Sequence, residues 1–150
     1  MTVTDKHKIG IIGSRSRNTD SDFDQIENTF LILCVELNIN PSETIIVSGG
    51  CPMGGDRFAE ILIKKYNTGK KIYPAQWDDL TSLGPNNEKP VIRMNKYGKK
   101  YNKSAGYWRN SDIARESDYL ICCVSESRKG GTEDTIKKAE ELNKKIIIVQ

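Results

Sequence analysis

Five short apolar runs alternate with amphipathic helical patterns along this chain, and that alternation constrains the fold more than any other feature. The apolar runs cover residues 8–14, 44–50, 71–74, 118–125 and 145–149. Helical patterns lie near residues 19–37, 56–67, 105–116 and 132–143. Strands that alternate with helices form a parallel sheet with right-handed crossovers and helices on both faces. We therefore predict an α/β fold, a Rossmann-like three-layer α/β/α domain with a mainly parallel sheet.

The length and composition of the chain narrow the class of protein. A chain of 150 residues fits one domain, so we expect residues 1–150 to form a single nucleotide-binding domain. No apolar run approaches the roughly 20 residues that span a bilayer, and residues 1–8 lack the apolar stretch of a secretory signal. We expect a cytoplasmic protein.

Cysteine and histidine usage bears on metals and redox chemistry. None of the four cysteines forms a Cys-x-x-Cys pair, and His7 is the only histidine. Asp20, Asp22 and Asp24 have the opening spacing of a calcium loop, but its later glycine and glutamate are missing. We expect no metal site, no disulfide and no resident cofactor.

Three polar, glycine-bearing segments, at residues 13–15, 49–56 and 130–132, each follow a predicted strand. Because the carboxyl ends of parallel strands meet at one edge of a sheet, where such folds bind ligands, these segments should lie close together. Glycine permits close backbone approach and positive φ, and a helix N-terminus attracts an anion. The Arg15 guanidinium can also hold a phosphate through two parallel hydrogen bonds. The sequence therefore predicts a phosphate-binding site at this edge.

The predicted ligand-binding residues come from these three segments and from the 105–116 helix. Asp56 has two interpretations, as the N-cap of its helix or as a contact to ribose hydroxyls. The chain lacks a Walker loop and a Gly-x-Gly-x-x-Gly after its first strand, which disfavours ATP hydrolysis and NAD-dependent hydride transfer. The ligand-binding residues are Gly13, Ser14, Arg15, Gly49, Gly50, Gly54, Gly55, Asp56, Arg57, Asn110, Gly130, Gly131 and Thr132.

Residues 77–104 show neither a helical nor a strand period and contain several glycines and prolines. A gap of that length indicates a lid, a binding loop or local disorder, and we expect a flexible loop that covers the ligand. Between residues 89 and 103, six basic residues are interleaved with Tyr97 and Tyr101. That pattern suits either a solvated surface or the binding of a nucleic acid single strand.

Motifs along nearly the whole chain resemble the SLOG superfamily. They are Gly-Ser-Arg at 13–15, the glycine-rich stretch at 48–60, Tyr-Pro-Ala-x-Trp at 73–77, Ala-Gly-Tyr-Trp-Arg-Asn at 105–110 and Lys-Gly-Gly-Thr-Glu-Asp-Thr at 129–135. Within it the chain is most similar to small YspA-like proteins, and more distantly to the DprA and Lonely-guy families. The resemblance implies a Rossmann-like domain that recognises nucleotides, nucleotide-sugars or nucleic acid and that often pairs as a homodimer.

The resemblance to Lonely-guy phosphoribohydrolases implies a catalytic arginine and glutamate. Arg109 falls where that family's arginine lies. The second glycine motif departs from the family pattern, so Glu133 or Asp134 would replace the glutamate; the alternative is that both only favour the positive end of the helix dipole. Three functions stay open: hydrolysis of the N-glycosidic bond of a nucleoside 5′-monophosphate or ADP-ribose-like molecule, non-catalytic nucleotide sensing, and DprA-like single-strand binding.

Overall fold

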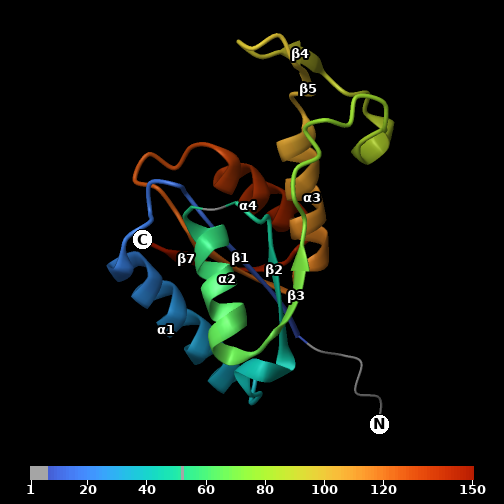
Figure 1. Cartoon of the computed structure of the whole chain (residues 1–150). Coiled ribbons are helices and arrows are strands. Elements are labelled where there is room, and N and C mark those ends of the chain that lie inside the picture. Colours follow the sequence, from blue (N-terminus) through green and yellow to red (C-terminus); the bar gives the residue numbers. More distant parts are fainter. Residues whose placement is uncertain (1–6, 52) are drawn as a thin grey trace.

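A five-stranded parallel sheet forms the centre of the protein, with the strand order β3-β2-β1-β6-β7 (Figure 1). The computed structural model describes residues 7–51 and 53–150. The expectation of a cytoplasmic protein rests partly on residues 1–8, and the first six of these lie outside the described residues. The strands are β1 (His7–Gly13), β2 (Thr44–Ser48), β3 (Gly69–Ile72), β6 (Tyr119–Cys123) and β7 (Lys145–Val149).

Two pairs of helices cover the two faces of the sheet, which confirms the predicted three-layer α/β/α architecture. Helices α1 and α2 pack with one apolar cluster, and α3 and α4 pack with another. Successive strand residues point to opposite faces, so Ile121 and Cys123 join the α1–α2 cluster while Leu120 and Cys122 join the other. The helices are α1 (Asp20–Glu36), α2 (Gly55–Tyr66), α3 (Ala105–Glu116) and α4 (Gly131–Glu141), and a short 3₁₀ turn η1 (Pro41–Glu43) precedes β2.

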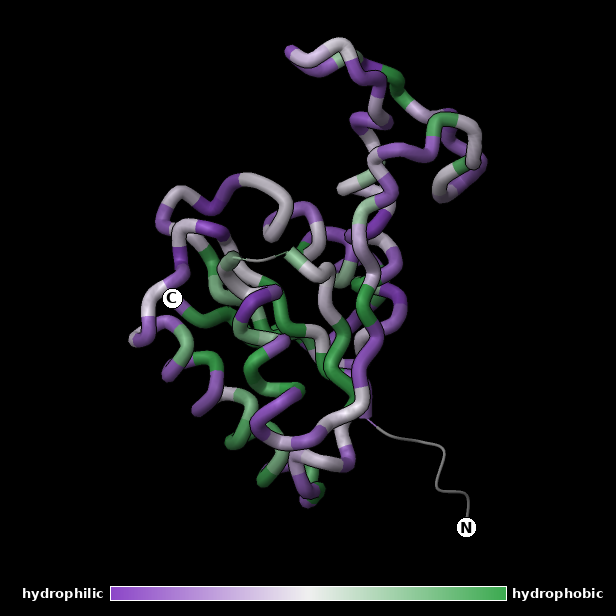
Figure 2. The backbone as a smooth tube through the Cα atoms, viewed as in Figure 1, coloured by the Kyte–Doolittle hydropathy of each residue, from purple (hydrophilic) through white to green (hydrophobic). Residues whose placement is uncertain are grey.

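The long helix α1 illustrates how the sequence sets local structure. Ile26, Phe30 and Leu33 recur at three- and four-residue steps and are buried against the sheet. The helix begins at a capping box, in which Thr19 Oγ1 accepts from the Asp22 amide and the Asp22 carboxylate accepts from the Thr19 amide. Figure 2 shows the hydrophobic residues gathered in the central strands and on the inner sides of the helices.

Strand β3 begins and ends two residues earlier than the sequence indicates. The predicted strand covers 71–74, whereas the observed one is Gly69–Ile72. Tyr73 still donates its amide to the Ser48 carbonyl oxygen at 2.8 Å. Pro74 has no amide hydrogen to extend the ladder, so the chain leaves the sheet there.

The arm, residues 77–104, projects from the body of the protein beyond α3 (Figure 1). It contains the 3₁₀ turn η2 (Pro85–Asn87) and an antiparallel hairpin of β4 (Ile92–Met94) and β5 (Lys100–Asn102). The sequence predicts no regular structure here. Each strand has only three residues and most of the hairpin is exposed, so the sequence shows no alternation of apolar and polar residues. The flexibility of the arm stays a prediction.

None of the described helices combines the length and the apolar character that crossing a bilayer requires.

Candidate functional site

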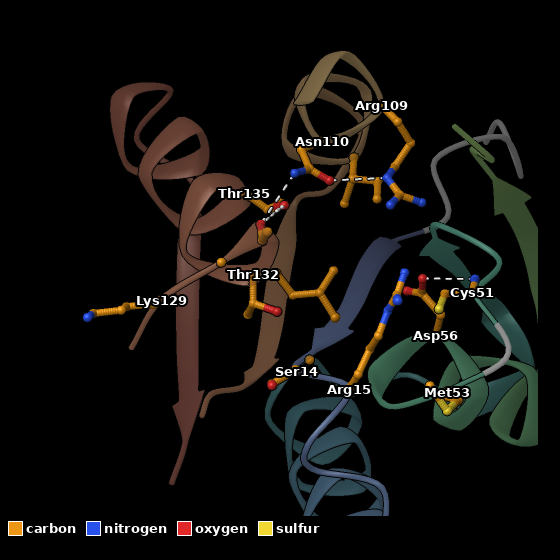
Figure 3. Close-up of a pocket in the computed structure, with 15 residues that line it drawn as sticks. Ser14, Arg15, Cys51, Met53, Asp56, Arg109, Asn110, Lys129, Thr132 and Thr135 are labelled. Atoms are coloured by element: carbon orange, nitrogen blue, oxygen red, sulfur yellow. Dashed lines mark hydrogen bonds between the residues drawn. The ribbon is translucent and has the colours of Figure 1, made fainter. Parts of the chain in front are cut away.

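A cleft of about 380 Å³ opens at the carboxyl ends of the central strands (Figure 3). Strand β1 pairs with β2 on one side and with β6 on the other, so the order of connections reverses at β1. Such a switch point is where doubly wound sheets bind ligands. The cleft is lined by Ile12, Gly13, Ser14, Arg15, Cys51, Met53, Asp56, Arg109, Asn110, Ile113, Lys129, Gly130, Gly131, Thr132 and Thr135.

The floor of the cleft depends on close contact between the end of β1 and the start of α2. A Cβ on Gly55 would lie 2.7 Å from the Ile12 carbonyl oxygen and would overlap the Gly13 amide nitrogen. Gly54, the N-cap of α2, has a φ of 69° and lies against the Ser14 carbonyl. Only glycine fits both demands, which is why this turn needs two of them.

Asp56 holds the turn between β2 and α2. Its Oδ1 accepts from Ser48 Oγ at 3.2 Å and from the Gly49 amide at 3.3 Å, and its Oδ2 accepts from the Cys51 amide at 3.0 Å. The N-cap of α2 is Gly54, so the N-cap interpretation of Asp56 is wrong. The carboxylate caps the preceding turn instead, and it also lines the cleft.

The start of α4 forms the opposite wall. Gly130 is its N-cap with a φ of 101°, and the helix begins at Gly131. The first backbone N–H groups of a helix have no partner within it and carry partial positive charge. Gly131 and Thr132 line the cleft, so this end of the helix lies at the ligand space.

Two adjacent residues of α3 connect the glycine turns. Arg109 Nη1 donates to the Gly49 carbonyl oxygen at 2.9 Å, and its Nε donates to Asn110 Oδ1 at 3.1 Å. Asn110 Nδ2 donates in turn to the Gly131 carbonyl oxygen at 3.3 Å and to Asp134 Oδ2 at 3.0 Å. Arg109 and Asn110 therefore link the β2–α2 turn to the start of α4.

Cationic groups dominate the charged residues of the cleft. Arg15 extends from the turn after β1 toward Asp56 and Cys51, while Arg109 reaches in from α3 (Figure 3). Lys129 also lines the cleft, but its ammonium points outward in the same view. The one acidic residue in the lining, Asp56, already accepts three hydrogen bonds.

The other two predicted catalytic residues lie beside the cleft rather than in its lining. Glu133 Oε2 is paired with Arg128 Nε at 2.8 Å. Asp134 Oδ2 is paired with Lys138 Nζ at 2.7 Å and accepts from Asn110. Both carboxylates occupy the first turn of α4, where they favour the positive end of the helix dipole.

All but one of the predicted ligand-binding residues belong to the cleft or to its turns. Six line the cleft together with Asp56 and Asn110, whereas Gly49, Gly50, Gly54 and Gly55 shape its turns. Arg57 lies elsewhere, with its Nε donating to Asn18 Oδ1 at 2.8 Å. The six lining residues are Gly13, Ser14, Arg15, Gly130, Gly131 and Thr132.

Several lining residues are not among the predicted ligand-binding residues. Cys51 and Met53 follow the glycine pair of the β2–α2 turn, and Thr135 lies one helical turn after Gly131. Thr135 Oγ1 donates to the Gly131 carbonyl oxygen at 3.1 Å. The position of Thr135 follows from the helical repeat once the start of α4 is known, so that spacing is the signal that could have found it.

The four cysteine thiols are free, and three of them are buried. Burial raises the pKa of the Cys34, Cys122 and Cys123 thiols, which keeps these groups protonated and unreactive. Cys51 is partly exposed and lines the cleft. It is therefore the thiol that a solute in the cleft would meet.

Comparisons with known proteins support the fold. No family model matches the chain, and no curated protein matches its sequence. A solved structure of the molybdenum cofactor carrier protein from Chlamydomonas reinhardtii aligns with 96% of this chain and 76% of its own, with a TM-score of 0.55 and 15% identity. A second structure, of the Moco carrier protein of the same organism, aligns with 97% and 76%, with a TM-score of 0.50 and 14% identity. The likeness confirms a Rossmann-like fold; membership of the SLOG superfamily stays a prediction.

Proposed function

We propose that this protein binds a phosphorylated nucleotide or nucleotide-sugar, with the phosphate at the start of α4 and beside Arg15. The observation that carries the proposal is the convergence of a helix N-terminus and two arginines on one cleft. Backbone N–H groups at a helix start and guanidinium groups are the donors that phosphate prefers. The cleft volume of about 380 Å³ is in the range of small-molecule sites.

Binding without turnover is the favoured form of this function. Hydrolysis of an N-glycosidic bond needs a carboxylate that can stabilise positive charge on the sugar and activate water. Glu133 and Asp134 are engaged in ion pairs outside the lining, and Asp56 is occupied by three donors. These contacts support a sensor or carrier over an N-glycosidase.

Titration calorimetry with a panel of ligands tests the proposal. The panel contains the four common nucleoside 5′-monophosphates, ADP-ribose and, because of the structural neighbours, the molybdenum cofactor. We expect Arg15→Gln to weaken the tightest ligand at least tenfold, because a hydrogen bond to a charged group is worth about 1.5–3 kcal/mol. The matched control is Arg93→Gln on the arm, which should bind like the wild type. Absence of binding at millimolar concentration across the panel would contradict the proposal.

A second candidate function rests on the arm. It has six basic residues and no acidic residue between 89 and 103, and the hairpin that carries most of them is largely exposed. One of the six, Lys99, is paired with Asp78 at 3.1 Å. Tyr97 at the hairpin tip is 82% exposed. Basic side chains can contact the phosphates of a nucleic acid single strand, and an exposed tyrosine ring can stack on one of its bases.

Fluorescence anisotropy with a short labelled single strand tests this second function. The double variant Lys96→Glu/Lys100→Glu should abolish binding and its salt dependence. A charge-matched control, Lys64→Glu/Lys137→Glu, changes exposed residues on α2 and α4 and should bind normally. Equal affinities of the two double variants would contradict single-strand binding by the arm.

Homodimerisation stays a prediction, which sedimentation of the purified protein checks.

A further inference from the structure

A second cavity, of about 370 Å³, lies between α3 and the chain that runs from the end of β3 through the arm. We call it the α3 cavity. Its apolar lining comes from both sides: Pro74 follows β3, Leu83 and Pro85 belong to the arm, and Ala105 and Trp108 lie on α3. A cavity of this size with such a lining suits one small ring system.

Two arginines and two aspartates line the α3 cavity, so its charges balance, and all four side chains make hydrogen bonds within the protein. Arg115 Nη2 contacts Asp112 Oδ1 at 2.7 Å. Asp79 Oδ1 accepts from the amides of Thr81 at 3.2 Å and Ser82 at 3.0 Å. The α3 cavity therefore differs from the cleft, whose cations outnumber its acids, and it suits an uncharged occupant.

Asn102 supplies an unused hydrogen-bond donor. The residue lines the α3 cavity and is only 1% exposed. Oδ1 accepts from the amides of Val91 at 3.2 Å and Ser104 at 3.0 Å, which fixes the orientation of the amide group. Nδ2 has no hydrogen-bond partner among the described residues. Buried donors are nearly always satisfied, so this one calls for an acceptor from an occupant.

Trp108 gives the α3 cavity a preformed wall. Its Nε1 donates to Glu88 Oε2 at 3.0 Å. Gly84 packs directly against the indole, since a Cβ there would lie 2.6 Å from Nε1. The ring is thus held before any ligand arrives, which reduces the entropy lost on binding.

Arg109 belongs to both cavities, because it lines the cleft and the α3 cavity alike. We propose that the two cavities form one extended binding site, in which the cleft takes the phosphate and the α3 cavity takes an uncharged, planar heterocycle that accepts a hydrogen bond from Asn102. This assignment rests on the proposed function and adds the part of the ligand that gives selectivity. Arg109 lies between the two halves of the bound molecule.

The test compares a complete nucleotide with its phosphosugar. Titration calorimetry measures the tightest-binding nucleoside monophosphate of the panel against ribose 5-phosphate. The wild type should bind the nucleotide at least tenfold more tightly. Ser82→Trp fills the mouth of the α3 cavity from an exposed position and should remove this difference without changing the affinity for ribose 5-phosphate. The matched control, Thr81→Trp, adds the same ring one residue away and should keep the difference.

Tryptophan fluorescence tests the same proposal without a substitution in the lining of the α3 cavity. The chain has two tryptophans, so Trp77→Phe leaves Trp108 as the only one. The nucleotide should quench Trp108 in this variant, and ribose 5-phosphate should not.

Each outcome separates the two proposals. Equal affinities for the nucleotide and ribose 5-phosphate, or a difference that survives Ser82→Trp, would overturn the extended site and leave the phosphate cleft standing. Failure of both ligands to bind the wild type would overturn the proposed function itself.

Discussion

Arg109 Nε donates to Asn110 Oδ1 at 3.1 Å, and through this bond the two glycine turns of the cleft are held by neighbouring residues of one helix. Arg109 reaches the turn after β2, and Asn110 reaches the start of α4. The spacing of the cleft walls therefore depends on α3, which contributes no glycine turn to the cleft.

Replacement of Asn110 should affect stability and ligand binding together. Asn110→Ala removes three hydrogen bonds from a residue that is 6% exposed. We expect a loss of about 1–3 kcal/mol in the free energy of unfolding, because a buried partner is left unsatisfied. Urea denaturation measures it, and calorimetry of the nucleotide should show weaker binding. Ser111→Ala, the neighbouring change, should leave both unchanged; a stable Asn110→Ala protein with normal affinity would show that α3 does not set the cleft.

Because the backbones are in close contact at the floor of the cleft, a single added methyl group there should destabilise the protein strongly. Gly55→Ala should lower the free energy of unfolding by about 1–3 kcal/mol, the range for overpacked sites, because the new Cβ meets the Ile12 and Gly13 backbone. Gly106→Ala is the control, since its Cβ would meet only the Trp77 side chain, at 3.1 Å, and alanine favours helix. Thermal unfolding compares the two variants. Equal melting temperatures would contradict the predicted contact.

The pair of Asp22 with Arg17 predicts a dependence of stability on pH. Burial raises the pKa of Asp22, but hydrogen bonds from Arg17 and Thr19 outweigh it and hold this pKa below its ordinary value. A carboxyl group with a depressed pKa stabilises the fold above its unfolded pKa, and that contribution is lost as the pH falls through the folded pKa.

Asp22→Asn should thus reduce the free energy of unfolding at pH 7 by about 1 kcal/mol, because the charged hydrogen bond with Arg17 is replaced by a weaker one to a neutral amide. The gap between variant and wild type should narrow as the pH falls below about 4, near the ordinary pKa of aspartate. Urea denaturation at a series of pH values measures the gap. The control variant Asp24→Asn changes an exposed neighbour and should have the same free energy of unfolding as the wild type at every pH. A constant gap for Asp22→Asn would exclude the ionised carboxylate as its source.

Thiol chemistry reports on the occupancy of the cleft. In the native protein, a disulfide reagent such as dithionitrobenzoate should modify Cys51 rapidly and the three buried thiols only after denaturation. Saturating nucleotide should slow the rapid phase, and Cys51→Ser should remove it. The absorbance of the released thiolate follows the reaction. Unchanged kinetics with bound nucleotide would place the ligand elsewhere.

Catalysis gives a further check on the proposed role. We expect no release of base when the wild type is incubated with the nucleotide panel and the products are separated by chromatography. If base is released, then Arg109→Ala, Glu133→Gln and Asp134→Asn identify its source. A loss of about 100-fold in turnover for either carboxylate variant would establish an acid–base role and reverse our preference for binding alone.

The sequence predicts the sheet well because its three central strands, β1, β2 and β6, are buried on both faces. Runs such as Ile9–Ile12 are nearly all apolar, and glycines mark where they stop. The same logic brings three glycine turns to one edge, and residues from all three line the cleft. The limits of β3 were less accurate, since the strand ends at Ile72, before Tyr73 and Pro74.

Side-chain directions at the site do not follow from the sequence pattern. Glu133 and Asp134 are adjacent acids in one helical turn, and their ion pairs depend on Arg128 and Lys138, which no motif singles out. One side of the α3 cavity is formed by the arm, whose sequence shows neither a helical nor a strand period. The unpaired donor of Asn102 can be identified only from the burial and the hydrogen bonds in the structure.

The central position of β1 has a consequence for how quickly the protein can fold. The Lys8 amide donates to the Asp118 carboxylate across 110 residues, where β1 and β6 come together. The arm lengthens this loop but adds no strand to the sheet. Topologies dominated by distant pairings fold slowly, whereas the entropy of closing a loop grows only with the logarithm of its length. The rate should therefore be set by the order of the strands, and a chain with the arm replaced by a short turn should fold only slightly faster.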